Sequence, residues 1–405
     1  MSDPSPSPAG AAPLAPVLWF SGLASFAAGS ATLGIFFVTE RVHAFSAAQQ
    51  YLLGLVVGVT YTLGALGAGR LRRALAARGC SARALLVLLG AGMTALMLVP
   101  LALPTGLALY GTLALYAPLT GCFWPLVEAY VSGGRRGGEL RTAIGRFNIV
   151  WSVTLLPGFW MLSPLLERAS GLVFLAIALA HLVALAFLVR FPREPGEHLD
   201  EEGHAAPASY RELLTVHRVL HATAYLVSYT LSPYLPKLLD GFGLAGGLAS
   251  VVASTWLFAR VATFVVMERW HGWHGRWSVA WGGIALVLIG FGATVLGPRL
   301  AVGPLACVVA GLFAFGCGVA ALYTAALYYV FEVGGNEGGG SHEALIGLGY
   351  SLGPACGLLV CGLERGGALA GQQRDGALLL AIAALAVGAA LWAWSHRRPG
   401  AARGR

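Results

Sequence analysis

Long apolar segments constrain the fold of this chain more than any other feature. Its 405 residues contain twelve runs of roughly 20 or more mainly apolar residues, each long enough to cross a bilayer as a helix. The hydrocarbon core offers the backbone no hydrogen-bond partners, so only helices or a closed barrel can span it. The runs lack the alternation of barrel strands, so they predict helices. The predicted spans lie near 17–38, 50–69, 84–103, 106–131, 143–164, 171–191, 218–237, 247–267, 278–297, 302–331, 343–363 and 376–395.

The composition agrees with a protein whose outer surface meets lipid. Hydrophobic types make up 57% of the chain and charged types only 11%, against about 25% in an ordinary soluble domain. These values exclude a soluble enzyme, a secreted disulfide scaffold and a disordered chain. We therefore predict an all-α polytopic membrane protein with the lipid bilayer as its surroundings.

The distribution of basic residues predicts the orientation. With the N-terminus in the cytoplasm, 19 of the 26 Lys and Arg residues fall in cytoplasmic loops or the C-terminal tail, and six fall outside. The remaining one, Arg260, lies inside a span. Cytoplasmic loops are enriched in Lys and Arg, so this bias predicts that both termini lie in the cytoplasm. We expect the protein to reside in the plasma (inner) membrane. It also accounts for the net charge of +8, and we expect no nucleic-acid partner.

A hydrophilic stretch divides the twelve spans into two groups of six. Its acidic residues indicate a solvated linker rather than a site. The predicted segments are an N-terminal cytoplasmic tail over 1–16, a six-helix bundle over 17–191, a cytoplasmic linker over 192–216, a second six-helix bundle over 217–396 and a basic cytoplasmic tail over 397–405.

The two halves contain similar segments. In 121–159 and again in 318–357, a span rich in glycine and aromatic residues leads into a polar, glycine-rich loop. Both loops are followed by an Ile-Gly pair, and then by Pro157 in one half and Pro354 in the other. Internal repeats of this kind are typical of transporter folds, and they predict two pseudo-symmetric six-helix bundles.

This layout resembles the major facilitator superfamily of secondary transporters over nearly the whole chain. The loop Gly69-Arg70-Leu71-Arg72-Arg73 is similar to the family's Gly-x-x-x-Asp-Arg-x-Gly-Arg-Arg pattern, although the aspartate is missing here. The segment FWPLVEAY…FNIVWS is similar to bacterial members without an assigned substrate. The resemblance implies that Arg70 and Arg73 belong to a gating loop.

A second motif of the family concerns helix packing. The predicted eleventh span resembles its Gly-Pro motif, and the fifth span keeps a shorter copy. Small residues on one helix face allow close approach and sliding, so we predict a packing or gating role for them. These residues are Gly349, Gly353, Pro354 and Gly357, with Pro157 and Gly158 in the fifth span and Gly54 and Gly58 in the second.

The resemblance further implies a central cavity between the two bundles, lined by the first, fourth, seventh and tenth spans. The bundles would rock to expose it to each side in turn. It implies a small-molecule solute as the partner, a coupling proton, no cofactor and a monomeric protein.

Ionisable side chains inside a span are costly, so they indicate a function or a partner. Glu128 lies near the end of the fourth span, and a carboxyl group whose charged form is disfavoured by burial suits proton coupling. A structural ion pair with Arg141 or Arg146 is the alternative. Arg260, near the middle of the eighth span, suits an anionic group of the substrate. Its alternatives are to neutralise a carboxylate such as Glu128, or to bind backbone carbonyls.

Further polar and aromatic residues lie on the spans assigned to the cavity. Asn148 and Arg146 open the fifth span, and Asn148 either binds substrate or joins two helices. We interpret His181, in the sixth span, as a packed histidine. Aromatic side chains fit an aromatic or amphipathic solute, with core packing as the alternative. They are Phe123, Trp124 and Tyr130 on the fourth span, Tyr225 and Tyr229 on the seventh, and Tyr323, Tyr328 and Tyr329 on the tenth.

These observations favour a secondary active transporter of a small organic solute, coupled to protons and acting by alternating access. Three alternatives stay open: a membrane enzyme that acts on lipid through the GGRRGGELR loop, a lipid flippase of the same fold, and a non-transporting assembly or sensor subunit. The chain has no P-loop or HExxH motif, and we expect neither an enzyme nor a metal site. His271 and His274 form a lone HxxH that we interpret as a membrane-interface anchor.

Overall fold

The computed structural model describes residues 10–197, 207–244, 248–334, 338–369 and 373–395. Every regular element within these ranges is a helix, as the apolar runs predicted. Residues 1–9 of the predicted N-terminal tail, 198–206 of the predicted linker and the predicted basic tail 397–405 lie outside this description.

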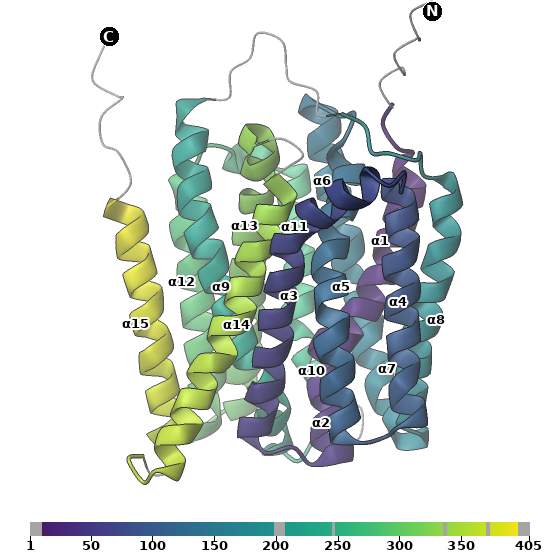
Figure 1. Ribbon diagram of the computed structural model, residues 1–405. Coiled ribbons are helices and arrows are strands. Elements are labelled where there is room, and N and C mark those ends of the chain that lie inside the picture. Colours follow the sequence, from purple (N-terminus) through teal and green to yellow (C-terminus); the bar gives the residue numbers. More distant parts are fainter. Residues whose placement is uncertain (1–9, 198–206, 245–247, 335–337, 370–372, 396–405) are drawn as a thin grey trace, which may run out of the picture.

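Six membrane-length segments make up the N-terminal half (Figure 1). They are α1–η1–α2 (Leu14–Gly29, Ser30–Gly34, Ile35–His43), α3 (Ala47–Ala76), α4 (Ala82–Ala102), α5 (Gly106–Ser132), α6–α7 (Gly137–Val153, Leu155–Arg168) and α8–η2 (Gly171–Phe187, Leu188–Arg190).

Six more segments make up the C-terminal half. They are α9 (Ala208–Asp240), α10–α11 (Leu248–Ala253, Thr255–Arg269), α12–η4 (Trp277–Leu296, Gly297–Arg299), α13 (Pro304–Gly334), α14 (Gly338–Arg365) and α15 (Arg374–Ser395), with the short η3 (His271–Trp273) after α11. In the described part of the chain, eleven of the twelve segments are long and apolar enough to cross a membrane. The twelfth, α9, is 33 residues long but more polar.

The helix α9 begins earlier than the sequence pattern suggested. It starts at Ala208, within the predicted linker, rather than near residue 218. The first two turns are amphipathic, because Leu213 and Leu214 are buried while Arg211 is exposed. The apolar face of this extension packs against the C-terminal half, which makes the segment helical although its composition is polar.

Two irregular segments interrupt the spans of the N-terminal half. The residues Ser30–Gly34 form a π-helical turn inside the first span. In the fifth span, α6 ends at Val153 and α7 starts at Leu155. Pro157 explains this break, because a proline has no N–H to donate to the carbonyl four residues earlier, which belongs to Val153.

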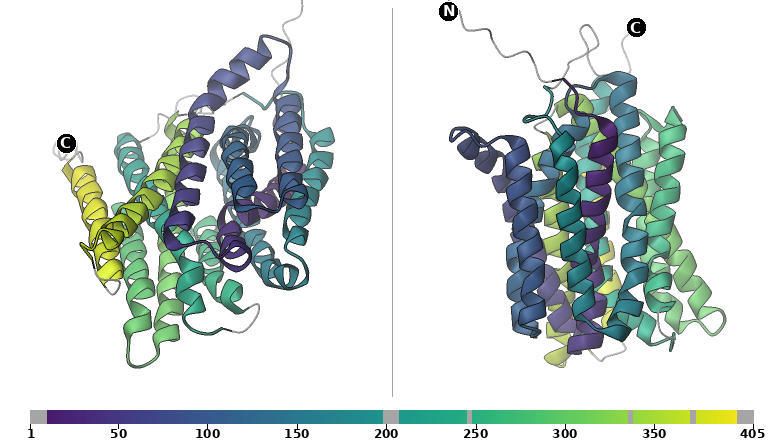
Figure 2. Two further views of the ribbon diagram at one scale, coloured as in Figure 1. Left: turned by 60° about the horizontal axis from the view of Figure 1, so that its bottom comes forward. Right: turned by 90° about the vertical axis from the view of Figure 1, so that its right-hand side faces the viewer.

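The two halves meet along two seams. On one side α3 and α14 run side by side, and on the other side α6–α7 packs against α10–α11 (Figure 1). α15 lies at the outer margin of the C-terminal half, away from both seams (Figure 2). We refer below to the end where α5 ends and α9 and α14 begin, at the top of Figure 1, as the upper end.

Glycines bring the helices at the first seam together. A Cβ atom added to Gly58 of α3 would lie 2.3 Å from the carbonyl oxygen of Tyr350 on α14. One added to Gly54 would lie 2.9 Å from the ring of Pro354. Within the C-terminal half, Gly353 approaches the carbonyl oxygen of Leu226 on α9 equally closely. The glycine faces noted in the sequence are therefore points of close contact between helices.

Candidate substrate cavity

A cavity lies between the two halves of the chain. Side chains reach it from α1, η1, α3, α5, α6 and α7 in one half and from α9, α11, α13 and α14 in the other. Most of the remaining lining is small or apolar, so aromatic rings dominate the walls. The aromatic lining residues are Tyr61, Trp124, Phe147, Trp151, Tyr225, Tyr229, Trp256, Tyr323 and Tyr350.

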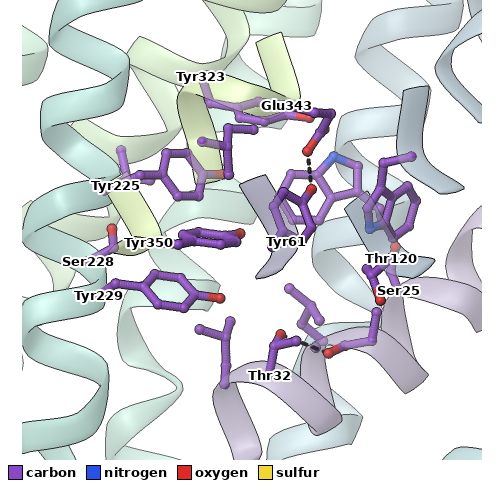
Figure 3. Close-up of a pocket in the computed structure, with 18 of the residues that line it drawn as sticks. Ser25, Thr32, Tyr61, Thr120, Tyr225, Ser228, Tyr229, Tyr323, Glu343 and Tyr350 are labelled. Carbon is purple, nitrogen blue, oxygen red and sulfur yellow. Dashed lines mark hydrogen bonds between the residues drawn. The ribbon is translucent and has the colours of Figure 1, made fainter. Parts of the chain in front are cut away.

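Three tyrosines form one wall of this cavity. The ring of Tyr350 stacks on that of Tyr229, with centroids 3.6 Å apart and planes 28° apart. Tyr225 lies one helical turn away on α9, with its ring centroid 5.4 Å from that of Tyr350. Figure 3 shows the Tyr350 ring between the other two. The wall presents ring faces and hydroxyl groups together, which suits a flat solute with polar edges.

Two carboxyl groups meet at the upper end of the cavity. Glu128 comes from α5 and Glu343 from the second turn of α14, and their side chains share a hydrogen bond. The Tyr61 hydroxyl donates a hydrogen bond to Oε2 of Glu343 (Figure 3). Both glutamates are buried, with 1% and 4% of their surface exposed. A carboxylate has acceptors only, so this contact needs a proton on one of the two groups.

Arg260 places a positive charge on another wall. Its guanidinium carbon lies 4.4 Å from the centre of the Trp151 ring and 4.9 Å from that of Trp256. Its Nε donates a hydrogen bond of 2.9 Å to Oγ of Ser152. The two tryptophans come from opposite halves, α6 and α11, so Arg260 lies at the second seam. Such cation–π contacts stabilise the charge while leaving N–H groups free to donate.

The structure pairs neither Glu128 nor Arg260 as the sequence alternatives suggested. No ion pair in the described residues joins Glu128 to Arg141 or Arg146, and Arg146 is exposed. Nor does one join Glu128 to Arg260, and the partner of Arg260 is a serine hydroxyl rather than a backbone carbonyl.

Asn148 lies outside the cavity lining, although it is fully buried. Its Oδ1 accepts a hydrogen bond of 3.3 Å from the Trp151 indole, one turn along the same helix. It therefore supports a tryptophan that covers Arg260. A smaller recess near the upper end receives Asn148 together with Glu268 of α11.

Several other residues from the sequence analysis pack within one half. The ring nitrogen Nε2 of His181 lies 2.8 Å from the Tyr116 hydroxyl, which makes it a packed histidine. Phe123 packs on Phe20, and the Tyr130 hydroxyl donates to the carbonyl of Pro192. Tyr328 and Tyr329 pack in a cluster at the upper end of the C-terminal half, with Trp273 and Tyr210.

The family-like loop after α3 forms a different contact from the expected one. Arg70 and Arg73 are exposed, and Arg72 between them forms an ion pair with Glu194. Glu194 follows α8, so an acidic residue from the other end of the half pairs with this loop in place of the missing aspartate. In the shorter copy of the Gly-Pro motif in the fifth span, Pro157 is exposed and Gly158 packs against Ser30 of the π-helical turn.

Sequence reasoning missed half of the polar site. Glu343 opens the predicted span 343–363, so it looked like a loop residue next to the polar GGGSH segment. Its partner Tyr61 and the stacked Tyr350 lie on the second and eleventh spans, which the resemblance does not assign to the cavity. The signal that could have found Glu343 is its place in the repeat, where the GGSHEALIG segment follows the same kind of loop as GGELRTAIG.

Three buried histidines lie on α9 and at the start of α14. The ring of His221 stacks on that of His342, with centroids 4.8 Å apart, and His217 lies one turn before His221 on α9. No hydrogen-bond partner for any of their ring nitrogens is found in the described residues. Among those residues no three His, Cys, Asp or Glu side chains converge as a metal site would require.

The remaining sequence candidates lie away from the cavity. His274 of the HxxH pair packs against Tyr328 and Trp273. In the GGRRGGELR loop, Arg135 is buried and donates to the backbone carbonyls of Tyr130 and Val131. This arginine therefore caps the end of α5.

The sequence matches no protein-family profile and no curated protein. Solved structures resemble it throughout. The nucleoside transporter NupG is 13% identical, with a TM-score of 0.66, over 95% of this chain and 98% of that chain. The human organic anion transporter MFSD10 (TETRAN) is 15% identical, with a TM-score of 0.62, over 94% of this chain and 98% of that chain. The chain therefore has the fold of the major facilitator superfamily of transporters.

Proposed function

We propose that this protein is a proton-coupled secondary transporter that moves a small organic solute by alternating access. The observation that carries the proposal is the buried pair of Glu128 and Glu343, one from each half, at the upper end of a cavity that both halves line. A proton between two carboxyl groups joins the halves, and loss of that proton leaves two like charges in contact. Proton binding thereby controls the contact between the halves.

The neighbours and the charge pattern support this proposal. Two solved structures with this fold are named as transporters of nucleosides and of organic anions, both small organic solutes. The bias of basic residues supports an orientation with the upper end in the cytoplasm, and in that orientation the carboxyl pair acts as a cytoplasmic gate. Tyr61, Tyr225, Tyr323 and Tyr350 line the cavity together with the pair.

The proposal is tested with purified protein in proteoliposomes that contain a pH-sensitive dye. Solutes from a panel of nucleosides, aromatic acids and amines are added outside, and a transported solute changes the internal pH. We expect E128Q and E343Q each to abolish solute-driven proton movement while solute exchange at equal pH continues. Glu268 of α11 lies at the same seam but outside the cavity, so E268Q is the matched control. Unchanged proton movement in both cavity variants would contradict the coupling role.

A further inference from the structure

Arg260 is a buried charge without a negative partner. Only 3% of its surface is exposed, and no ion pair in the described residues includes it. Its Nη2 is buried and has no hydrogen-bond partner in the described residues. A buried charge costs several kcal/mol unless it is paired or hydrogen-bonded, so an acceptor at this donor would be stabilising.

The surroundings hold this guanidinium in one place. Trp151 and Trp256 lie within 5 Å of the guanidinium carbon, and Ser152 accepts from Nε. A rigid guanidinium loses little freedom when it binds a ligand. Ser152 accepts from Nε, so Nη2 of this cavity-lining arginine is left as an unpaired donor for a carboxylate or a similar acceptor.

The rest of the cavity favours a flat ring beside that charge. Tyr225, Tyr229 and Tyr350 line the same cavity as Arg260. Their rings form the stacked wall described above. A ligand can therefore place a carboxylate at Arg260 and a ring against this wall at the same time.

We infer that the transported solute is a planar aromatic anion whose carboxylate binds Nη2 of Arg260 and whose ring lies against Tyr225, Tyr229 and Tyr350. This inference rests on the proposed transport function and names its substrate class. It distinguishes such anions from two other flat solutes, neutral nucleosides and aromatic amines, because only an anion neutralises Arg260.

The first test compares charge states on one ring and needs no variant. The thermal unfolding of purified protein is followed with 4-hydroxyphenylacetate and indole-3-acetate, with the amide of each acid, and with tyramine and uridine. Ligand binding raises the unfolding temperature. We expect the acids to raise it and their amides, tyramine and uridine not to do so at the same concentration. Equal stabilisation by an acid and its amide, or by uridine, would overturn the inference.

The second test assigns the effect to Arg260. We expect R260Q to weaken binding of the acids about 10- to 100-fold, which corresponds to loss of a hydrogen bond to a charged group. R260K keeps the charge but not the planar donor, so its loss should be smaller. Arg276 also lies over a tryptophan, Trp270, but it is exposed and outside the cavity, which makes R276Q the matched control. Wild-type affinity for the acids in a folded R260Q protein would refute the site.

The two proposals fail separately. If uridine or an amide exchanges across proteoliposomes and the acids do not, transport stands and the substrate class is wrong. If the acids bind but no solute of the panel exchanges, the site stands and the transport proposal fails. If nothing in the panel binds or exchanges, both fail.

Discussion

Glu128 and Glu343 come from opposite halves of the chain and share a hydrogen bond at the upper end of the cavity. They are 215 positions apart in the sequence, on α5 and α14, so only the folded protein brings the two groups together. In the proposed function one proton holds the two groups together, so the protonation state of the pair controls the contact between the halves. This relationship leads to the first prediction.

Loss of the shared proton should part the halves at the upper end. Spin labels at R146C of α6 and R269C of α11 replace exposed side chains on opposite halves, in a background without the six native cysteines. We expect the distance between the labels to lengthen when the pH rises from about 6 to about 9, because two carboxylates in contact repel. In E128Q, which keeps a neutral donor opposite Glu343, the distance should stay short. A wild-type distance independent of pH would contradict the gate.

Close packing of α3 on α14 should make Gly58 intolerant of any side chain. The added Cβ of G58A would lie 2.3 Å from the carbonyl oxygen of Tyr350, and backbone cannot move aside as a flexible side chain can. We expect G58A to lower the unfolding free energy by about 1–3 kcal/mol, as overpacking typically does. Gly67 lies on the same helix and faces open space, so G67A should be neutral or stabilising by up to about 1 kcal/mol. Thermal unfolding measures both, and similar values for the two variants would refute the packing argument.

The buried bond between Tyr116 and His181 should support stability without affecting transport. Y116F leaves the His181 nitrogen without its partner 2.8 Å away, and a buried unsatisfied polar group costs about 1–3 kcal/mol. Tyr51 is the control, because its hydroxyl is buried without a partner in the described residues, so Y51F should be neutral or stabilising. Unfolding temperature and solute exchange are measured for both variants. A loss of exchange in folded Y116F would show that the bond serves function.

Acid should weaken the protein through His274, which lies between α11 and α12 outside the spans. Burial, with nearby Arg141 and His271, lowers the pKa of His274 to about 4. An unfolded histidine has a pKa near 6.5, so between about pH 6.5 and pH 4 only the unfolded chain binds this proton. Stability should therefore fall as the pH falls through that window.

The variant H274Q removes this contribution. We expect the unfolding temperature of wild type to fall more than that of H274Q when the pH is lowered from 7 to 5. The difference is the relevant quantity because it cancels every other group that titrates in both proteins. If the difference between the two proteins does not depend on pH, then His274 binds its proton equally well in the folded and the unfolded state.

Much of the site followed from local pattern. Glu128 and Arg260 stood out because charges are rare within long apolar runs, and the structure places both at the cavity. Tyr225, Tyr229 and Tyr323 also line it, as their helices suggested. Asn148 does not line the cavity. Which residues of the fifth span face the cavity depends on how this broken helix packs.

Other features depended on pairing across the chain. Ser152 and Trp256 are unremarkable in sequence, yet together with Trp151 they hold Arg260 in place. Glu194 pairs with Arg72 although 122 positions separate them. Local propensity contains no information on such contacts, since they arise when the spans pack.

The sequence by itself determined that this chain is a bundle of membrane-length helices, because apolar length and backbone satisfaction in lipid leave no other choice. It also determined which few side chains would carry charge inside that bundle. Only the tertiary structure decided that Glu128 faces Glu343, and that Arg260 lies between two tryptophans with one donor free. The reason is physical: hydrophobicity specifies which segments are buried, whereas close packing of glycine faces specifies which buried groups meet.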